Sequence, residues 1–184
     1  RCDMDVRTWP AEIPALAARL PGKVVLPGDD VYETARLAWN LRAAMAPAAI
    51  VYVQSRADVS EALKFAHEHD LRVAIQSTGH RETVDGKGCL VINTSAMKAL
   101  AVDPAARTAY LEAGVKWGEV LAQTQVHGLA PLIGSSGDVG AVGYTLGGGL
   151  GWLARKYGMS VDSVLRFEVV TADGRVRIAS PEEH

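Results

Sequence analysis

The chain has an unusual stretch at residues 134–151, which reads GSSGDVGAVGYTLGGGLG and holds eight of the 18 glycines. An even spread would place about two glycines there. Glycine inside a helix or strand costs about 1 kcal/mol relative to alanine, so a run this dense needs a reason, such as close approach of the backbone to a flat or anionic ligand. A flexible surface loop is the alternative, but flexible linkers lack large apolar residues such as Val139, Val142 and Tyr144. The stretch is therefore a candidate binding site.

Composition places the chain among globular proteins and excludes several classes of partner. It has 184 residues, of which 48% are hydrophobic and 22% are charged, as expected for a packed domain. Nineteen Lys and Arg residues face 21 Asp and Glu residues, for a net charge of -2. Because the two signs are interspersed and form no basic block, we expect no binding to nucleic acid.

Metal and membrane sites are not expected either. The two cysteines, Cys2 and Cys89, have no second Cys or His at a metal-ligand spacing. The longest nearly apolar stretch, residues 43–53, contains Pro47 and is far shorter than the roughly 20 residues that cross a bilayer. The chain begins at Arg1 with no leader pattern, so we expect a cytoplasmic protein and leave secretion open.

The first half of the chain has the rhythm of an α/β protein. Residues 1–45 form an N-terminal segment with helices expected at 15–20 and 31–45. Residues 49–53 and 71–76 are apolar runs typical of buried strands, and a helical pattern at 59–69 separates them. This order and length predict a parallel β-α-β unit.

The second half changes character. Strand patterns are expected at 90–93, 108–113 and 166–171, and helices at 117–127 and 144–157. Asp173-Gly174 is a strong hairpin signal, so antiparallel pairing is expected. We therefore predict an α+β fold of two subdomains with a boundary near residue 100. The first would hold a small parallel β-α-β sheet and the second a mainly antiparallel sheet with helices.

A second candidate loop follows the strand expected at 71–76. It reads Gln76-Ser77-Thr78-Gly79-His80, and small residues at the end of a parallel strand let backbone N–H groups surround an anion such as a diphosphate. Its spacing matches neither the dinucleotide fingerprint G-x-G-x-x-G nor the ATPase motif G-x-x-x-x-G-K-[ST]. An ordinary Ser/Thr/Gly turn is the alternative.

Together, in this order, the two loops resemble the FAD-binding (PCMH-type) domain of the vanillyl-alcohol oxidase and para-cresol methylhydroxylase superfamily, most closely its berberine-bridge-enzyme-like FAD-linked oxidases. Residues 76–80 are similar to the family's R-S-G-G-H, and residues 145–153 to its T-L-G-G-G-x-G-W-L. Further matches follow at 155–158, Asp162 and 169–174. The resemblance covers the chain from about Trp39 onward.

The resemblance implies the cofactor, its site and its attachment. The cofactor would be FAD, bound by the domain at residues 46–184, and in this family the position of His80 carries a covalent bond from an imidazole nitrogen to the flavin 8-methyl group. The implied FAD-binding residues are Gln76, Ser77, Thr78, Gly79, His80, Arg81, Ser135, Ser136, Asp138, Val139, Gly140, Val142, Gly143, Tyr144, Gly147, Gly148, Gly149, Tyr157, Gly158 and Val169.

The sequence also departs from the family pattern. Gln76 stands where the family has Arg, Thr78 where it has Gly, and Arg81 where many members carry a small polar residue. Members with two flavin bonds have Cys-Pro ahead of the glycine triplet, whereas this chain has Ser136-Gly137, so a second, cysteinyl bond cannot form. We expect one covalent bond, or noncovalent FAD if His80 does not react.

Family members are much longer, and their substrate-binding domain follows the point where this sequence stops. The chain is thus expected to be the FAD-binding part of an oxidase, with its substrate domain and catalytic base in further sequence or in a partner chain. The resemblance implies oxidation of an alcohol, sugar or phenol, with dioxygen as electron acceptor. Two alternatives stay open: a noncatalytic flavin- or nucleotide-binding module, and a hydroxy-acid dehydrogenase with noncovalent FAD.

Overall fold

The computed structural model describes residues 12–41, 45–80 and 86–183. The chain divides into two compact units. The first consists of residues 1–94 with 168–177, and the second of residues 95–167 with 178–184.

The first unit is built on a four-stranded sheet in the order β1-β2-β4-β3. Its strands are β1 (Val24–Val25), β2 (Ala49–Tyr52), β3 (Val73–Gln76) and β4 (Leu90–Asn93). Strand β4 lies between β2 and β3 and runs parallel to both, and β1 is antiparallel to β2. This confirms the predicted parallel β-α-β unit, with β4 inserted between its two strands.

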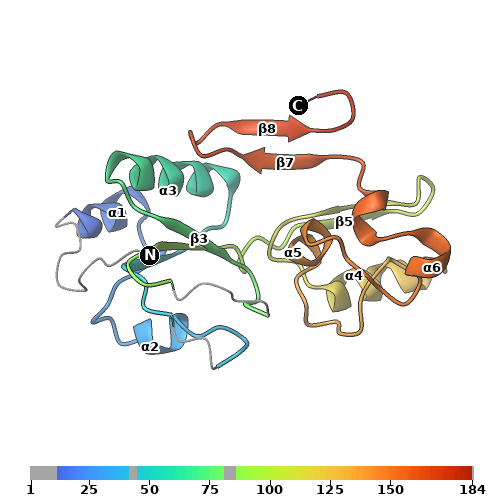
Figure 1. Ribbon diagram of the computed structural model, residues 1–184, viewed down its shortest axis with the longest axis horizontal. Helices are drawn as coiled ribbons and strands as arrows, with labels where there is room; N and C mark the ends of the chain where they lie inside the picture. The colour runs from blue at the N-terminus through green and yellow to red at the C-terminus, as the bar shows by residue number, and fades with distance from the viewer. Residues whose placement is uncertain (1–11, 42–44, 81–85, 184) are drawn as a thin grey trace. The chain divides into compact units, whose positions relative to one another are not determined.

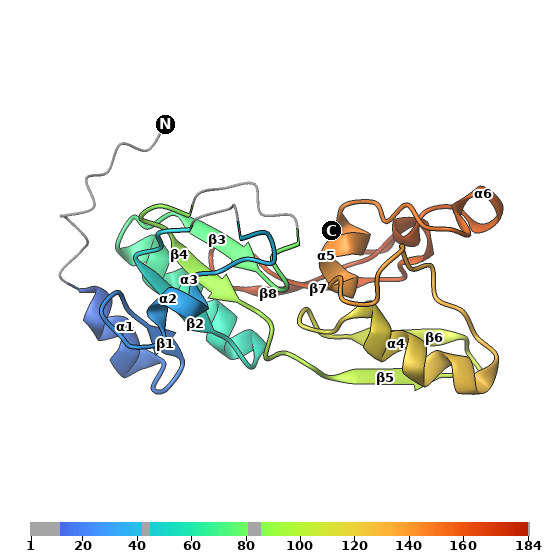
Figure 2. The same cartoon turned by 90° about the horizontal axis from the view of Figure 1, so that it is seen from below.

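Helices cover both faces of this sheet, which explains why its central strands are apolar without alternation. Figure 1 shows α1 (Ile13–Arg19) and α3 (Arg56–Glu68) above the sheet and α2 (Tyr32–Ala35) below it. Tyr32 of α2 packs with Ile50 and Val91 on the lower face. Figure 2 turns the same unit so that α2 is seen in front of the strands.

Helix α3 begins with a well-formed cap that also ties it to the sheet. The Ser55 hydroxyl accepts a hydrogen bond from the Asp58 N–H at 3.2 Å, as an N-cap side chain does. The Asp58 carboxylate accepts from the Gln54 N–H at 2.8 Å and pairs with Lys23 Nζ at 2.7 Å. These contacts join the end of β2, the start of α3 and the residue before β1.

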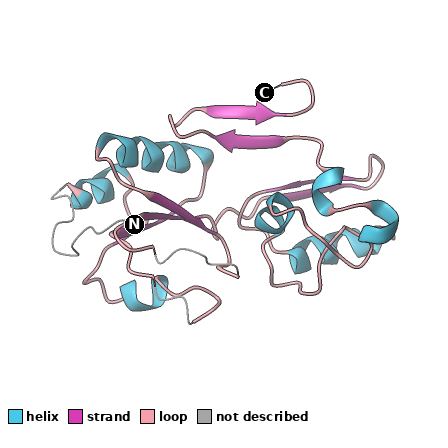
Figure 3. Cartoon of the chain, in the orientation of Figure 1, coloured by secondary structure: helices cyan, strands magenta, loops and turns pink. Residues whose placement is uncertain are grey.

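The predicted hairpin is present. Strands β7 (Phe167–Val170) and β8 (Val176–Ala179) form a two-stranded sheet and run in opposite directions, as Figure 3 shows. Its turn packs on α3, where the Ser60 hydroxyl donates to the Gly174 carbonyl at 2.5 Å. The Arg56 guanidinium and the Glu168 carboxylate form an ion pair at 2.6 Å.

The second unit contains an antiparallel pair of strands, β5 (Leu100–Asp103) and β6 (Thr108–Leu111), and helix α4 (Trp117–Thr124). A short 3₁₀ helix, Gln125–His127, extends α4. The unit also holds α5 (Ala141–Leu146), α6 (Ala154–Tyr157) and a 3₁₀ turn at Ser160–Ser163. The α+β class is confirmed, but the antiparallel strands of the second unit differ from those expected: β5 was not predicted, and most of the predicted hairpin, residues 168–177, belongs to the first unit.

Two predicted helices are wrong in extent. The helix expected at 31–45 ends at Ala35, because the side chain of Gln76, the last residue of β3, donates to the Leu37 carbonyl and the backbone of residues 38–39 packs on the loop after β3. Residues 42–44 of the expected helix lie outside the described residues. The helix expected at 144–157 is divided into α5 and α6, because Gly148 and Gly149 adopt φ values of +98° and +74°. Such values are left-handed and end an α-helix.

Across residues 12–41, 45–80 and 86–183, we find no helix with the length and apolar character needed to cross a membrane.

Candidate cofactor site

The loop that carries the candidate histidine lies at the end of β3, the edge strand of the sheet in the first unit. Gln76, the last residue of β3, is buried, and its side-chain amide donates to the Leu37 carbonyl at 3.3 Å. Gly79 adopts φ +70°, and a Cβ there would lie 3.0 Å from both Ala38 Cα and Trp39 N. The loop is therefore packed directly against residues 37–39.

Two neighbours hold the His80 ring. Its Nδ1 lies 3.0 Å from the Thr78 hydroxyl, within hydrogen-bonding distance. The indole of Trp39 stacks on the imidazole, with ring centroids 4.6 Å apart and planes inclined by 17°. The side chain is half-buried, so the imidazole is both fixed and open to solvent on part of its surface.

In the second unit, the glycine-rich stretch wraps around one side chain, Tyr144. A Cβ at Gly134 would lie 3.0 Å from Tyr144 Cε2, and one at Gly149 would lie 2.8 Å from Cε1. A Cβ at Gly151 would lie 3.1 Å from the Tyr144 hydroxyl and 2.1 Å from the Ile133 carbonyl oxygen. Three glycines of the stretch thus make room for the phenol ring and the chain beside it.

The other glycines divide between contacts within the protein and open space. Gly148 has its would-be Cβ 2.5 Å from Met159 Cε, and Gly137 packs against the backbone of Gly118. Gly143 has no atom within 4 Å of its would-be Cβ, and Gly147 has only ordinary contacts. Packing against the protein's own atoms therefore accounts for part of the glycine excess, and the approach of a ligand to the stretch stays a prediction.

A buried polar network fixes the turn at the glycine triplet. The Ser160 and Val161 N–H groups donate to the carbonyls of Gly149 and Gly148 at 2.9 and 3.0 Å. The Thr145 and Ser160 hydroxyls lie 2.9 Å apart, and Thr145 also donates to the Ala141 carbonyl. The triplet is therefore a rigid feature of the second unit.

The remaining candidate residues lie in three places. Ser135, Ser136 and Asp138 form an exposed loop before α5, where Asp138 pairs with Lys116 at 3.4 Å. Tyr157 is exposed at the end of α6, before Gly158, whose φ is +82°. Val139 and Val142 are partly buried, and Gly140 is the buried N-cap of α5. Val169 is exposed on β7 and belongs to the first unit. Arg81 lies outside the described residues.

Two buried donors next to the glycine stretch have no partner among the described residues. They are the indole Nε1 of Trp117 and the hydroxyl of Tyr144, whose rings meet edge to face with centroids 5.7 Å apart. An unsatisfied buried polar group costs about 1–3 kcal/mol, so such groups usually bind water or a ligand. Burial also raises the pKa of Tyr144, so its hydroxyl stays protonated and able to donate at neutral pH.

These features fit FAD. In the second unit, the exposed glycines Gly143 and Gly147 leave backbone accessible to a ligand. His80 supplies a nucleophilic nitrogen held by its neighbours. Trp117 is 5% exposed and packs in the core of the second unit. Trp39 was not among the residues predicted from the sequence, because its upstream position offers no pattern that pairs it with His80.

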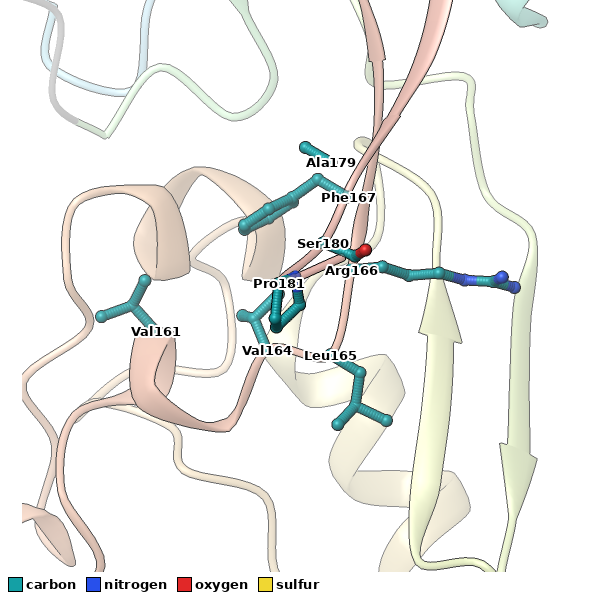
Figure 4. A pocket seen from close by; sticks show the side chains of 8 residues that line it. All are labelled: Val161, Val164, Leu165, Arg166, Phe167, Ala179, Ser180 and Pro181. Carbon is teal, nitrogen blue, oxygen red and sulfur yellow. The ribbon is translucent and has the colours of Figure 1, made fainter. Parts of the chain in front are cut away.

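The second unit also has a shallow pocket of about 260 Å³. Figure 4 shows its lining, which comes from the 3₁₀ turn and the segments that begin β7 and end β8. None of its eight lining residues is a candidate for FAD binding, so the pocket is a separate feature. They are Val161, Val164, Leu165, Arg166, Phe167, Ala179, Ser180 and Pro181.

Comparison with known proteins identifies the family. A family model described as an FAD binding domain matches residues 47–180. The FAD-linked oxidoreductase YgaK of Bacillus subtilis is 36% identical over 159 residues, which cover 84% of this chain and 35% of that protein. The (R)-6-hydroxynicotine oxidase of Paenarthrobacter nicotinovorans is 30% identical over 166 residues, covering 89% of this chain and 36% of the enzyme.

Solved structures of FAD-linked oxidases have the same fold as this chain. The crystal structure of 6-hydroxy-D-nicotine oxidase from Arthrobacter nicotinovorans superimposes with a TM-score of 0.84 at 30% identity, covering 89% of this chain and 37% of that one. The structure of the wild-type BBE-like 1 protein of Physcomitrella patens superimposes with a TM-score of 0.81 at 30% identity, and the match covers 92% of this chain and 38% of that one. The chain thus spans little more than a third of the length of these relatives. It belongs to the FAD-binding domain family of the vanillyl-alcohol oxidase and berberine-bridge-enzyme-like FAD-linked oxidoreductases.

Proposed function

We propose that the chain is the FAD-binding part of an oxidase that acts on an alcohol, sugar or phenolic substrate, and that His80 holds the flavin covalently. The observation that carries the proposal is the state of His80, whose imidazole is held by the Thr78 hydroxyl and the Trp39 indole at the end of a parallel strand. Relatives named as FAD-linked oxidoreductases and oxidases support the reaction class.

The residues of the chain would share the work of holding the cofactor. His80 would anchor it through one imidazole nitrogen. Ser135, Ser136 and the exposed backbone at Gly143 and Gly147 would provide further donors. With Ser136-Gly137 in place of Cys-Pro, the attachment would be single.

When bound, FAD accepts a hydride from a substrate C–H bond and passes the two electrons to dioxygen, which yields hydrogen peroxide. The residue that removes the substrate's hydroxyl proton is not among the candidate residues, and we place it in the part of the protein that corresponds to the remaining length of the relatives. That part, in the same or a partner chain, would also bind the substrate.

The test is to purify the native gene product and record its visible spectrum before and after anaerobic addition of alcohols, sugars and phenols. We expect a flavin spectrum that one of these classes bleaches, and hydrogen peroxide on admission of air. Bleaching followed by slow reaction with air but fast reaction with artificial acceptors would instead indicate a dehydrogenase. A flavin that no substrate class bleaches would favour a noncatalytic binding module and contradict the proposal.

A further inference from the structure

The second unit exposes several large apolar side chains around its shallow pocket. Leu146, Leu150 and Leu165 have 63%, 73% and 67% of their surface exposed, and Met159 and Val161 have 36% and 37%. Single exposed apolar residues are ordinary on a protein surface, whereas a continuous apolar surface usually contacts another protein or a ligand. What matters is therefore whether these five residues are adjacent.

Contacts at the glycine triplet join the five residues. The Val161 N–H donates to the Gly148 carbonyl at 3.0 Å, and a Cβ at Gly148 would lie 2.5 Å from Met159 Cε. Leu146 and Leu150 stand two positions before and after Gly148 in the chain. Val161 and Leu165 both line the pocket. The five residues thus form a connected surface, here called the apolar face, from the glycine triplet to the pocket.

The pocket suits apolar side chains better than a small-molecule substrate. Its lining is apolar apart from Ser180 and Arg166, and Figure 4 shows the Arg166 guanidinium pointing away from Val161 and Phe167. Its volume of about 260 Å³ lies below the roughly 300–1,000 Å³ of pockets that enclose small ligands. A few apolar side chains from another protein surface can fill such a hollow.

Arg166 gives the pocket a charged rim. Its side chain is exposed and has no ion-pair partner within residues 12–41, 45–80 and 86–183. The nearby Asp162 carboxylate is already engaged, because it accepts the Met159 N–H at 2.7 Å. Charged groups across an interface are arranged to be complementary, so a protein surface that covers the pocket is expected to place a carboxylate near Arg166.

The length of the relatives indicates what covers the apolar face. The match covers 35% of YgaK and 37% of the crystallised 6-hydroxy-D-nicotine oxidase, so most of each relative lies outside the matched part. Domains of one protein pack through interfaces of about 600–1,500 Å², whose centre buries apolar side chains. FAD is a weaker candidate for this face, because none of the pocket-lining residues belongs to the predicted FAD site.

We propose that the apolar face is the surface on which the remaining part of the protein docks, with apolar side chains of that part in the pocket and a carboxylate opposite Arg166. The proposal rests on the proposed function, which identifies the remaining part as the substrate-binding part of an oxidase, in the same or a partner chain. It goes beyond that function by assigning the surface of the second unit that holds this part.

The first test is hydroxyl-radical labelling of side chains in the native gene product, purified with any subunit that stays bound to it. Val126 is the internal control, because it is 73% exposed in the same unit and lies outside the apolar face. Each rate is divided by the rate in the unfolded protein, which removes the intrinsic difference between Leu and Val. We expect Leu165 and Leu150 to be labelled at least about 5-fold more slowly than Val126, because the centre of an interface excludes water. Equal normalised rates would overturn the proposal.

Two further conditions identify what covers the face. In protein prepared without flavin, Leu165 should stay protected, whereas protection that appears only when FAD is added would show that the cofactor covers it. Dilution should also leave the protection in place, whereas protection lost as a homodimer dissociates would show that a second copy covers it. Either of these alternative results would overturn the proposal.

The labelling result and the oxidase test can fail separately. A flavin that a substrate bleaches, together with a freely labelled Leu165, would overturn the docking surface and leave the proposed function standing. A flavin that no substrate bleaches, together with a protected Leu165, would contradict the oxidase and support the docking surface.

Substitutions give the second test. The readout is the rate at which a protease cleaves between the two parts of the native gene product, or the rate of dissociation if the second part is a separate subunit. Leu165→Asp should raise this rate at least about 10-fold, because docking would bury an unpaired carboxylate. Val126→Asp, the matched control, should leave the rate unchanged.

Arg166 variants test the charge at the rim. Arg166→Glu should raise the same rate about 2- to 5-fold, the effect of an exposed ion pair, and Arg166→Lys should keep most of the wild-type behaviour. Equal rates in Leu165→Asp and Val126→Asp would overturn the proposal. If Leu165→Asp fails to fold, the labelling of Leu165 in the wild-type protein decides the question.

Discussion

The histidine loop at residues 76–80 and the glycine stretch at residues 134–151 use glycine for different purposes. In the loop, the left-handed Gly79 brings two backbone segments together, and the side chains around it hold the His80 imidazole. In the stretch, most glycines make room for Tyr144, Met159 and nearby backbone. In the second unit, much of the glycine density therefore serves packing within the protein, whereas in the first unit the loop holds the imidazole that we propose carries the flavin.

The difference also shows where a ligand should be sought. In the glycine stretch, the informative features are Gly143, whose would-be Cβ has no atom within 4 Å, and Gly147, which is exposed and has only ordinary contacts. The positions with the closest approaches, such as Gly149, are already filled by protein atoms. Substitution of each kind of glycine should separate folding from cofactor binding.

The largest expected loss of stability comes from Gly149→Ala. The new Cβ would lie 2.5 Å from Ser160 Cβ and 2.8 Å from Tyr144 Cε1, at a φ of +74°. The left-handed backbone and the overpacking together should lower the free energy of unfolding by about 2–5 kcal/mol. The measurement is chemical denaturation of the native gene product, followed by tryptophan fluorescence.

Gly143→Ala is the control for that substitution. Nothing lies within 4 Å of the new Cβ, and the residue is inside α5, so stability should stay the same or rise by up to about 1 kcal/mol. Its FAD affinity should fall if the cofactor approaches this backbone. Equal stability losses in the two variants would refute the division into packed and open glycines.

The sheet that carries the histidine loop should be sensitive to acid through Asp58. Burial raises the pKa of this carboxyl, but the hydrogen bonds from Lys23 and from the Gln54 N–H more than offset it, so the pKa is lowered overall. Asp58→Asn should cost about 1–3 kcal/mol at pH 7, because Lys23 loses its ion-pair partner. Thermal or chemical denaturation measures this loss.

The pH dependence has a definite sign. A carboxyl with a lowered pKa stabilises the fold above its unfolded value of about 3.9 and loses that contribution as the pH falls through the folded value. The stability difference between wild type and Asp58→Asn should therefore shrink as the pH is lowered below about 4. Glu33→Gln, which breaks an exposed ion pair with Arg36, should change stability by less than about 1 kcal/mol. A difference independent of pH would contradict the role of the Asp58 carboxylate.

Gly79→Ala should have a smaller effect on stability and a specific one on the flavin. The new Cβ would meet Gln76 Nε2 at 2.9 Å, which is a side chain that can shift, and Ala38 Cα at 3.0 Å. We expect a loss of about 1–2 kcal/mol, mostly from the left-handed backbone. Displacement of the loop should also reduce acid-stable flavin, and normal attachment would count against the packing of the loop on residues 37–39.

Tyr144→Phe should have the smallest effect on the fold. Its hydroxyl is buried without a described partner, so its removal should leave the stability of the FAD-free protein unchanged or raise it by up to about 1 kcal/mol. The affinity for FAD should fall about 2- to 10-fold if the hydroxyl donates to the cofactor. Equilibrium titration with FAD measures this, and a destabilised FAD-free protein would show that the hydroxyl has a structural partner.

The sequence was most informative where the pattern was local. Continuous apolar runs predicted β2 and β3, and the boundaries predicted for β4 agree with those observed. Asp173-Gly174 predicted the hairpin. The helix expected at 31–45 failed because contacts made by Gln76 and Gly79, some forty residues later, determine the path of residues 37–39. The helical periodicity of residues 144–157 predicted one continuous helix, because apolar spacing carries no information on the left-handed backbone that Gly148 and Gly149 adopt.

The candidate site shows the same limit. The motif at residues 76–80 identified His80, because its residues are contiguous and their spacing matches a known pattern. Trp39 could not be found in this way, because its role depends on a tertiary contact across 41 positions. Likewise, the sequence signals the glycine excess at residues 134–151, but only coordinates reveal that the glycines surround Tyr144.

The most direct measurement is the mass of the His80 peptide from acid-denatured native gene product, compared with the same peptide from a His80→Ala variant. If His80 carries the cofactor, the wild-type peptide gains the mass of one flavin group and its visible absorbance, and the variant peptide gains neither. Flavin released entirely into the acid supernatant of the wild type, or flavin that stays covalently bound in His80→Ala, would contradict the assignment.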